Sequence, residues 1–106
     1  MELSVWVGFV EVRQLPVDDP PIKLSGKGAF TWVACWAVDE ESYRTQVAEM
    51  FLADGLFIVD VDNVMPSNDA ADAGLIGHEL AELVERVSKN MNYCIFGTFH
   101  TYRHDN

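Results

Sequence analysis

Basic residues are missing from the middle of this sequence. Between Thr45 and Glu85 there are nine carboxylates and no lysine or arginine, and the whole chain carries a net charge of −10. The seven basic residues are scattered and form no stripe that could follow a phosphate backbone, so we expect no nucleic-acid partner. The acidic region instead favours the attraction of basic proteins or cations.

Long hydrophobic runs are missing as well. Every apolar stretch is far shorter than the roughly 20 residues that a membrane helix needs. The apolar stretch at the start follows Glu2 and no basic region, which is not typical of a secretory signal. The sequence therefore predicts a cytoplasmic protein with no membrane partner.

Cysteine is scarce. Cys35 and Cys94 are the two in the chain, and both lie in apolar, strand-like segments. This setting favours buried free thiols in a reducing compartment, and a disulfide between neighbouring strands is the alternative. A metal site is less favoured because neither cysteine has a second ligand at close spacing.

Recognisable catalytic and metal-binding motifs are also absent. His78 begins a zinc-protease-like helix motif, but Glu82 stands where the second histidine is required. Segment 60–63 (DVDN) begins like a calcium loop, but Met65 replaces its essential glycine. The serines lack a nucleophile elbow, and no phosphate-binding loop is present. We therefore predict no metal and no cofactor, leave catalytic residues unknown, and leave enzymatic activity open.

What the chain does contain is enough apolar material for a core. Its residues are 49% hydrophobic and 11% aromatic, and a length of 106 residues is typical of a single domain. We expect one α+β domain over residues 1–106.

The first half of the sequence predicts two strands, a helix and a third strand. Apolar segments 3–12 and 30–38 flank a loop from Gln14 to Gly28 that is rich in proline and glycine. Asp39 is the expected N-cap of an amphipathic helix that Gly55 ends, and an apolar strand over 56–61 follows. Residues 30–61 therefore predict a strand–helix–strand unit.

The second half predicts a second helix and a last strand. The helix is capped by Asn68 or Asp69, although Gly74 and Gly77 weaken its first turns. The last strand spans about residues 93–102. The predicted fold is a two-layer α+β sandwich in ββαβαβ order, with a four-stranded mixed sheet, two helices on one face, and a ferredoxin-like architecture.

Several predicted strands are apolar on both faces. Two helices on one face would leave an aromatic sheet face in water, which a soluble monomer rarely tolerates. A second copy of the chain is the expected cover, and a different protein or the folded-back 14–28 loop are the alternatives. The candidate interface or pocket consists of Trp32, Trp36, Phe99 and His100.

Two functions remain open from the sequence. The first is a non-enzymatic acidic interaction module, such as an inhibitor, an immunity-type protein or a regulatory protein, that binds a basic partner. Its candidate acidic surface consists of Asp60, Asp62, Asp69, Asp72, Glu79 and Glu82. The alternative is a small dimeric α+β barrel-type enzyme or small-ligand-binding protein with an aromatic cavity. A structural subunit is a third possibility.

Overall fold

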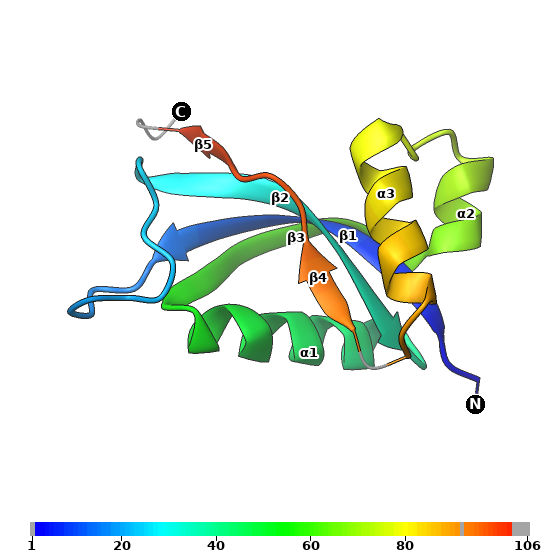
Figure 1. The fold of residues 1–106 in the computed structure, drawn as a ribbon, viewed down its shortest axis with the longest axis horizontal. Helices are drawn as coiled ribbons and strands as arrows, with labels where there is room; N and C mark the ends of the chain where they lie inside the picture. The colour runs from blue at the N-terminus through cyan, green and yellow to red at the C-terminus, as the bar shows by residue number, and fades with distance from the viewer. Residues whose placement is uncertain (1, 92, 103–106) are drawn as a thin grey trace.

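A computed structural model describes residues 2–91 and 93–102. Figure 1 shows a twisted sheet crossed by helices on two sides. Within the described ranges, the elements follow the order β1 (Ser4–Gln14), β2 (Gly28–Ala37), α1 (Glu40–Ala53), β3 (Leu56–Pro66), α2 (Ser67–Asp72), α3 (His78–Ser88), β4 (Cys94–Phe96) and β5 (His100–Tyr102).

The sheet is built around β1. Strand β1 pairs antiparallel with β2 on one side and with β3 on the other, while β4 and β5 pair antiparallel with β2. The order is β3-β1-β2-β4, with β5 also on β2. The expected strand–helix–strand unit is present, but β1 separates its two parallel strands. The predicted mixed sheet of four strands is therefore wrong, because every described pair of neighbours is antiparallel and there are five strands.

Helices cover both faces of this sheet. Side chains alternate along β1, so Val10 and Val12 point to one face and Val5 and Val7 to the other. The first pair packs in a core cluster with Tyr43, Val47 and Phe51 of α1. The second pair packs with Ala70, Leu80, Leu83 and Val87 of α2 and α3. We call these the α1 face and the α3 face. The prediction of two helices on one face is wrong.

Local sequence sets both ends of α1. The Asp39 carboxylate accepts a hydrogen bond from the Ser42 amide at 2.7 Å, which confirms the expected N-cap. Gly55 follows the helix with a φ of 83°, a conformation that glycine adopts without strain. The Tyr43 ring lies against Gly8 of β1, where a β-carbon would stand 2.7 Å from the tyrosine hydroxyl.

The predicted second helix is two helices. Helix α2 starts directly after β3, and α3 starts at His78, after Gly77. Between them, Gly74 takes a φ of 74°. The two glycines therefore separate the helices, and α3 begins late.

The predicted last strand is also divided. Phe96 lies opposite Val33 on β2, but His100 lies opposite Phe30. Between these two pairs, the last segment has three residues (97–99), whereas β2 has two (31–32). The extra residue, as in a β-bulge, reverses the side-chain alternation. Phe99 consequently turns to the α1 face, where its ring lies 5.0 Å from that of Phe96.

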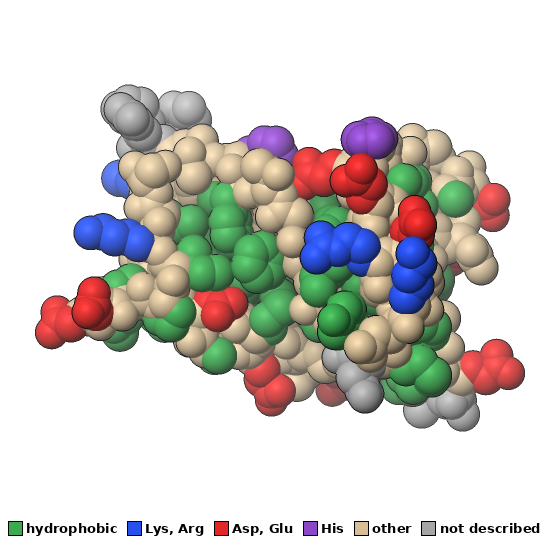
Figure 2. All heavy atoms as spheres, in the orientation of Figure 1, with side chains coloured by type: hydrophobic (Ala, Val, Ile, Leu, Met, Phe, Trp, Pro, Cys, Tyr) green, Lys and Arg blue, Asp and Glu red, His purple; other side chains and the backbone are tan. Residues whose placement is uncertain are grey.

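The proline-rich segment 15–27 is fastened to the rest of the fold. The Gln14 side chain donates to the carbonyls of Ile22 and Gly55 at 2.9 and 3.0 Å, and it accepts from the Leu24 amide at 2.7 Å. Ile22 and Leu24 pack against the α1-face core. Figure 2 shows hydrophobic side chains gathered between this loop and β4.

The fold is thus an α+β arrangement of a five-stranded antiparallel sheet with three helices. The ferredoxin-like likeness is not confirmed. Cys35 and Cys94 are free thiols, as the sequence favoured, but Cys35 is buried and Cys94 is partly exposed. In the part of the chain that the structure describes, none of the helices has the length and apolar character needed to cross a membrane.

Candidate functional site

Helices α2 and α3 cover one end of the α3 face and leave the other end open. The core beneath them includes Val5, Val7 and Ala34, but Phe9 and Phe30 belong to neither core cluster. Strand register places a set of side chains on this uncovered end. We call it the open sheet face, and it consists of Phe9, Glu11, Arg13, Phe30, Phe57, Asp60, Asp62, His100 and Tyr102.

Aromatic rings form the floor of the open sheet face. The rings of Phe9 and Phe30 are stacked, with centroids 5.5 Å apart and an interplanar angle of 6°. Trp32 lies 5.1 Å from Phe9, and Tyr102 lies 5.4 Å from Phe30. The four rings therefore run in contact across three strands. All four remain partly exposed, so this floor offers apolar surface to a binding partner.

Tyr102 links the floor to charged groups. Its hydroxyl donates a hydrogen bond to the Glu11 carboxylate, and the Arg13 Nε donates to the tyrosine oxygen at 3.3 Å. The hydrogen bond to Glu11 raises the pKa of Tyr102. Gly28 permits this arrangement, because a β-carbon there would stand 2.5 Å from the tyrosine hydroxyl and 2.7 Å from the Val12 carbonyl.

Carboxylates line the β3 side of the floor. Asp60 lies opposite Glu11 in the register, and Asp62 lies opposite Phe9. Both aspartates are exposed, and Asp60 accepts a hydrogen bond only from the adjacent Val61 amide among the bonds identified in the described chain. Like charges directly opposite each other on a sheet are unfavourable. A cationic group placed between the strands would relieve this repulsion.

Strand β3 is an edge strand with two irregularities. Its register against β1 shifts between Val7 and Phe9 and again between Glu11 and Val12, in each case with one extra residue in β3. Asn63, in the first shift, takes a φ of 54°. Such bulges twist an edge and hinder unwanted strand pairing. The free edge of β3 is therefore poorly suited to pairing with an added strand. A partner is more readily recognised through the side chains that β3 presents on the α3 face.

The four residues of the predicted aromatic site are not brought to one cavity. The Trp36 indole donates to the Val87 carbonyl at 2.7 Å beneath α3, and Trp32 lies at the boundary between the helix-covered and open parts. His100 is on the open sheet face, whereas Phe99 packs against Phe51 on the opposite face. Their role as an interface or pocket stays a prediction.

The predicted acidic residues lie on three elements. Asp60 and Asp62 are on β3, and the other four are on α2 and α3, namely Asp69, Asp72, Glu79 and Glu82. Glu79 accepts the Thr98 amide at 2.8 Å and approaches His100 at 3.6 Å. Figure 2 shows acidic and basic side chains mixed over α3. Arg86 in the last turn of α3 and Lys89 just after it supply basic groups beside these acidic ones, and Lys89 lies 3.4 Å from Glu85.

The arrangement lacks a recognisable catalytic set. His78 lies 3.2 Å from Glu82 and His100 lies 3.6 Å from Glu79, but both histidines are largely exposed, at 90% and 60%. Neither pair contacts a serine or cysteine in the interactions found among the described residues. In the same part of the chain, no three histidine, cysteine or acidic residues form a group that could hold a metal ion.

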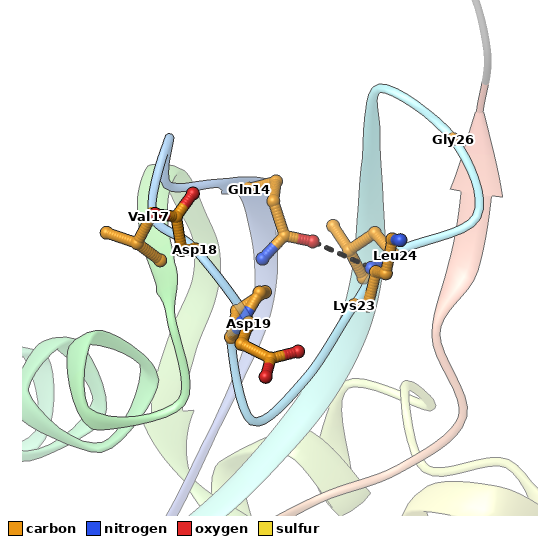
Figure 3. A pocket seen from close by; sticks show the side chains of 8 residues that line it. Gln14, Val17, Asp18, Asp19, Lys23, Leu24 and Gly26 are labelled. Carbon is orange, nitrogen blue, oxygen red and sulfur yellow. Dashed lines mark hydrogen bonds between the residues drawn. The ribbon is translucent and has the colours of Figure 1, made fainter.

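A separate depression lies in the 15–27 loop. It has a volume of about 360 Å³, and Figure 3 shows Asp18, Asp19 and Lys23 around it beside the Gln14 side chain. Asp19 takes a φ of 54°. This pocket is lined by loop residues rather than by the aromatic residues that the sequence singled out.

Sequence reasoning missed Phe9, Phe30 and Tyr102 as members of the site. One signal was present. On one face of the first strand, the apolar residues 3, 5, 7 and 9 are followed by Glu11 and Arg13, which indicates that the cover ends at this point.

No protein-family model matches the chain, and no curated protein and no solved structure matches it either.

Proposed function

We propose that this protein is a non-enzymatic interaction module that binds a basic protein segment on its open sheet face. It would act as an inhibitor, an immunity-type protein or a regulatory protein. The observation that carries the proposal is the combination of an aromatic floor, Phe9–Phe30–Tyr102, with exposed carboxylates on the neighbouring strand, Asp60 and Asp62.

Arginine is the side chain that best suits this surface. Its planar guanidinium stacks on aromatic rings and pairs with carboxylates at the same time. Phe9 would supply the ring and Asp62, its partner in the register, would supply the charge. The net charge of −10 would add long-range attraction that speeds the encounter.

A basic partner fits this face better than a second copy of the chain. Two copies placed face to face would bring both sets of Asp60, Asp62 and Glu11 together, and like charges at an interface oppose association. The homodimer expected from the sequence therefore ranks second. Light scattering at low and high salt separates the two, because an apolar dimer keeps twice the chain mass at both salt concentrations.

A hexa-arginine peptide tests the site directly. We expect it to shift the amide resonances of Phe9, Phe30 and Asp62 in NMR titrations at low salt, and we expect hexa-glutamate to shift none of them. Binding should weaken strongly as added salt shortens the screening length from about 10 Å at 0.1 M to about 3 Å at 1 M.

A matched pair of variants separates the site from net charge. Asp60→Asn with Asp62→Asn removes two charges from the open sheet face. Asp69→Asn with Asp72→Asn removes two exposed charges from α2. We expect the first variant to weaken peptide binding about threefold to tenfold and the second to have little effect. Equal losses in both variants would show that only net charge matters and would refute the proposed site.

A further inference from the structure

The two cysteines face each other across neighbouring strands. Cys35 on β2 is the register partner of Cys94 on β4. Both are free thiols, Cys35 fully buried and Cys94 partly exposed. They lie on the α1 face, where both belong to or pack against the same core cluster. The sheet therefore holds two sulfur atoms side by side although they are distant in the sequence.

The hydrogen-bond pattern defines the type of this pair. The Trp36 amide donates to the Tyr93 carbonyl at 3.5 Å, and the Gly97 amide donates to the Trp32 carbonyl at 2.9 Å. Hydrogen-bonded and non-hydrogen-bonded pairs alternate along antiparallel strands, so Cys35 and Cys94 form a non-hydrogen-bonded pair. Such pairs have Cα atoms about 4.5 Å apart, within the range of roughly 4.4–6.8 Å seen in disulfides.

We propose that Cys35 and Cys94 form an oxidation site at which a peroxide closes a cross-strand disulfide. The site takes hydrogen peroxide as the oxidant. The bond would fix β4 to β2 and would close a long loop of the chain containing α1, β3, α2 and α3. This inference does not depend on the proposed function.

The chemistry balances with peroxide as the electron acceptor. The Cys35 sulfur, as thiolate, attacks one peroxide oxygen, so an S–O bond forms, the O–O bond breaks and hydroxide leaves. The Cys94 sulfur then attacks the Cys35 sulfur, the S–S bond forms, and the S–O bond breaks. The hydroxyl group of the sulfenic acid takes up the Cys94 proton and leaves as water. The hydroxide released in the first step takes up the Cys35 proton and becomes the second water. In total, two thiols and one peroxide give one disulfide and two waters.

The surroundings favour this order of events. The hydrogen bond from Cys94 lowers the pKa of Cys35, although burial opposes the shift. The same contact and burial raise the pKa of Cys94. Thiolate character directs oxidation to Cys35. The partly exposed Cys94 lies on a strand of three residues at the sheet margin, so a small oxidant can enter when this short strand opens.

Peroxide treatment of the folded, reduced protein tests the proposal. We expect loss of both reactive thiols, a monomer whose mass falls by two hydrogen atoms, and recovery of both thiols with dithiothreitol. The oxidised protein should melt at a higher temperature than the reduced protein, because the bond constrains the unfolded chain. Retention of both thiols, disulfide-linked dimers as the main product, or a lower melting temperature would each overturn the proposal.

Two variants make the test specific. In Cys94→Ser, the Cys35 sulfenic acid has no partner, so dimedone should trap it in the folded protein. The double variant Cys94→Ser with Ile95→Cys keeps two thiols but moves one to the opposite face of β4. We expect it to form no intramolecular disulfide. Disulfide formation in this control as fast as in the original chain would show that register does not direct the reaction.

Discussion

The hydroxyl of Tyr43 joins α1 to the middle of the sheet. Tyr43 is fully buried, and its hydroxyl donates a hydrogen bond to the Val33 carbonyl of β2 at 2.8 Å. In Tyr43→Phe the ring stays in place over Gly8, but the bond is lost and a buried carbonyl loses a donor. Net loss of one such bond costs about 1 kcal/mol, so we expect the free energy of unfolding to fall by about 1 kcal/mol.

Urea denaturation followed by tryptophan fluorescence measures this loss. With an m-value of about 1.5 kcal/mol/M, the midpoint should fall by about 0.7 M while m stays unchanged. Tyr93→Phe is the matched control, because the Tyr93 side chain is 46% exposed. Its effect should stay within about 0.5 kcal/mol. Equal midpoints for Tyr43→Phe and the original chain would refute the idea that this hydrogen bond fastens the helix to the sheet.

Three further perturbations test the loop, the site and the buried phenol. Burial raises the pKa of Tyr43 well above its ordinary value near 10, so the unfolded chain loses that proton first and the free energy of unfolding should fall as pH rises above about 10. Tyr43→Phe should make this fall shallower in urea titrations between about pH 8 and pH 11, and an unchanged slope would contradict the assignment. Gln14→Leu removes three hydrogen bonds from segment 15–27; we expect a loss of about 2 kcal/mol and faster tryptic cleavage after Lys23, whereas an unchanged cleavage rate would mean that other contacts hold the loop. Gly28→Ala would push against Tyr102 and the Val12 carbonyl; we expect a loss of about 1–3 kcal/mol and NMR shifts at Glu11, and an unperturbed Glu11 would show that Tyr102 does not respond.

Features fixed by neighbouring residues could be predicted from the sequence. The Asp39 cap, the Gly55 stop and the apolar stripe of α1 all depend on contacts within a few residues. The interruption near Gly74 has the same local origin. The distribution of helices over two faces could not be predicted this way, because it depends on where α2 and α3 dock after β3 has paired with β1.

Bulges explain why the predicted aromatic site was only partly assembled. Strict alternation from Tyr93 onwards puts Phe99 and His100 on opposite faces, but it also puts His100 on the face of Phe96. The extra residue between Phe96 and His100 puts His100 on the face opposite to that of Phe96. His100 therefore lies with Tyr102 beside Phe30. Because one inserted residue reverses every later side chain, the composition of this face could not be read without the register.

The lengths of the elements account for the open sheet face. Strand β1 has 11 residues and spans about 36 Å, whereas α3, also of 11 residues, spans only about 16 Å. Helix α3 therefore cannot cover the whole strand, and the sequence changes to Glu11 and Arg13 where the cover ends. Solvent exposure explains these two charged residues. It does not explain the stacked rings of Phe9 and Phe30 beside them, since neither ring belongs to a core cluster. A partner whose cationic side chains stack on these rings would account both for the rings and for the carboxylates beside them on β3.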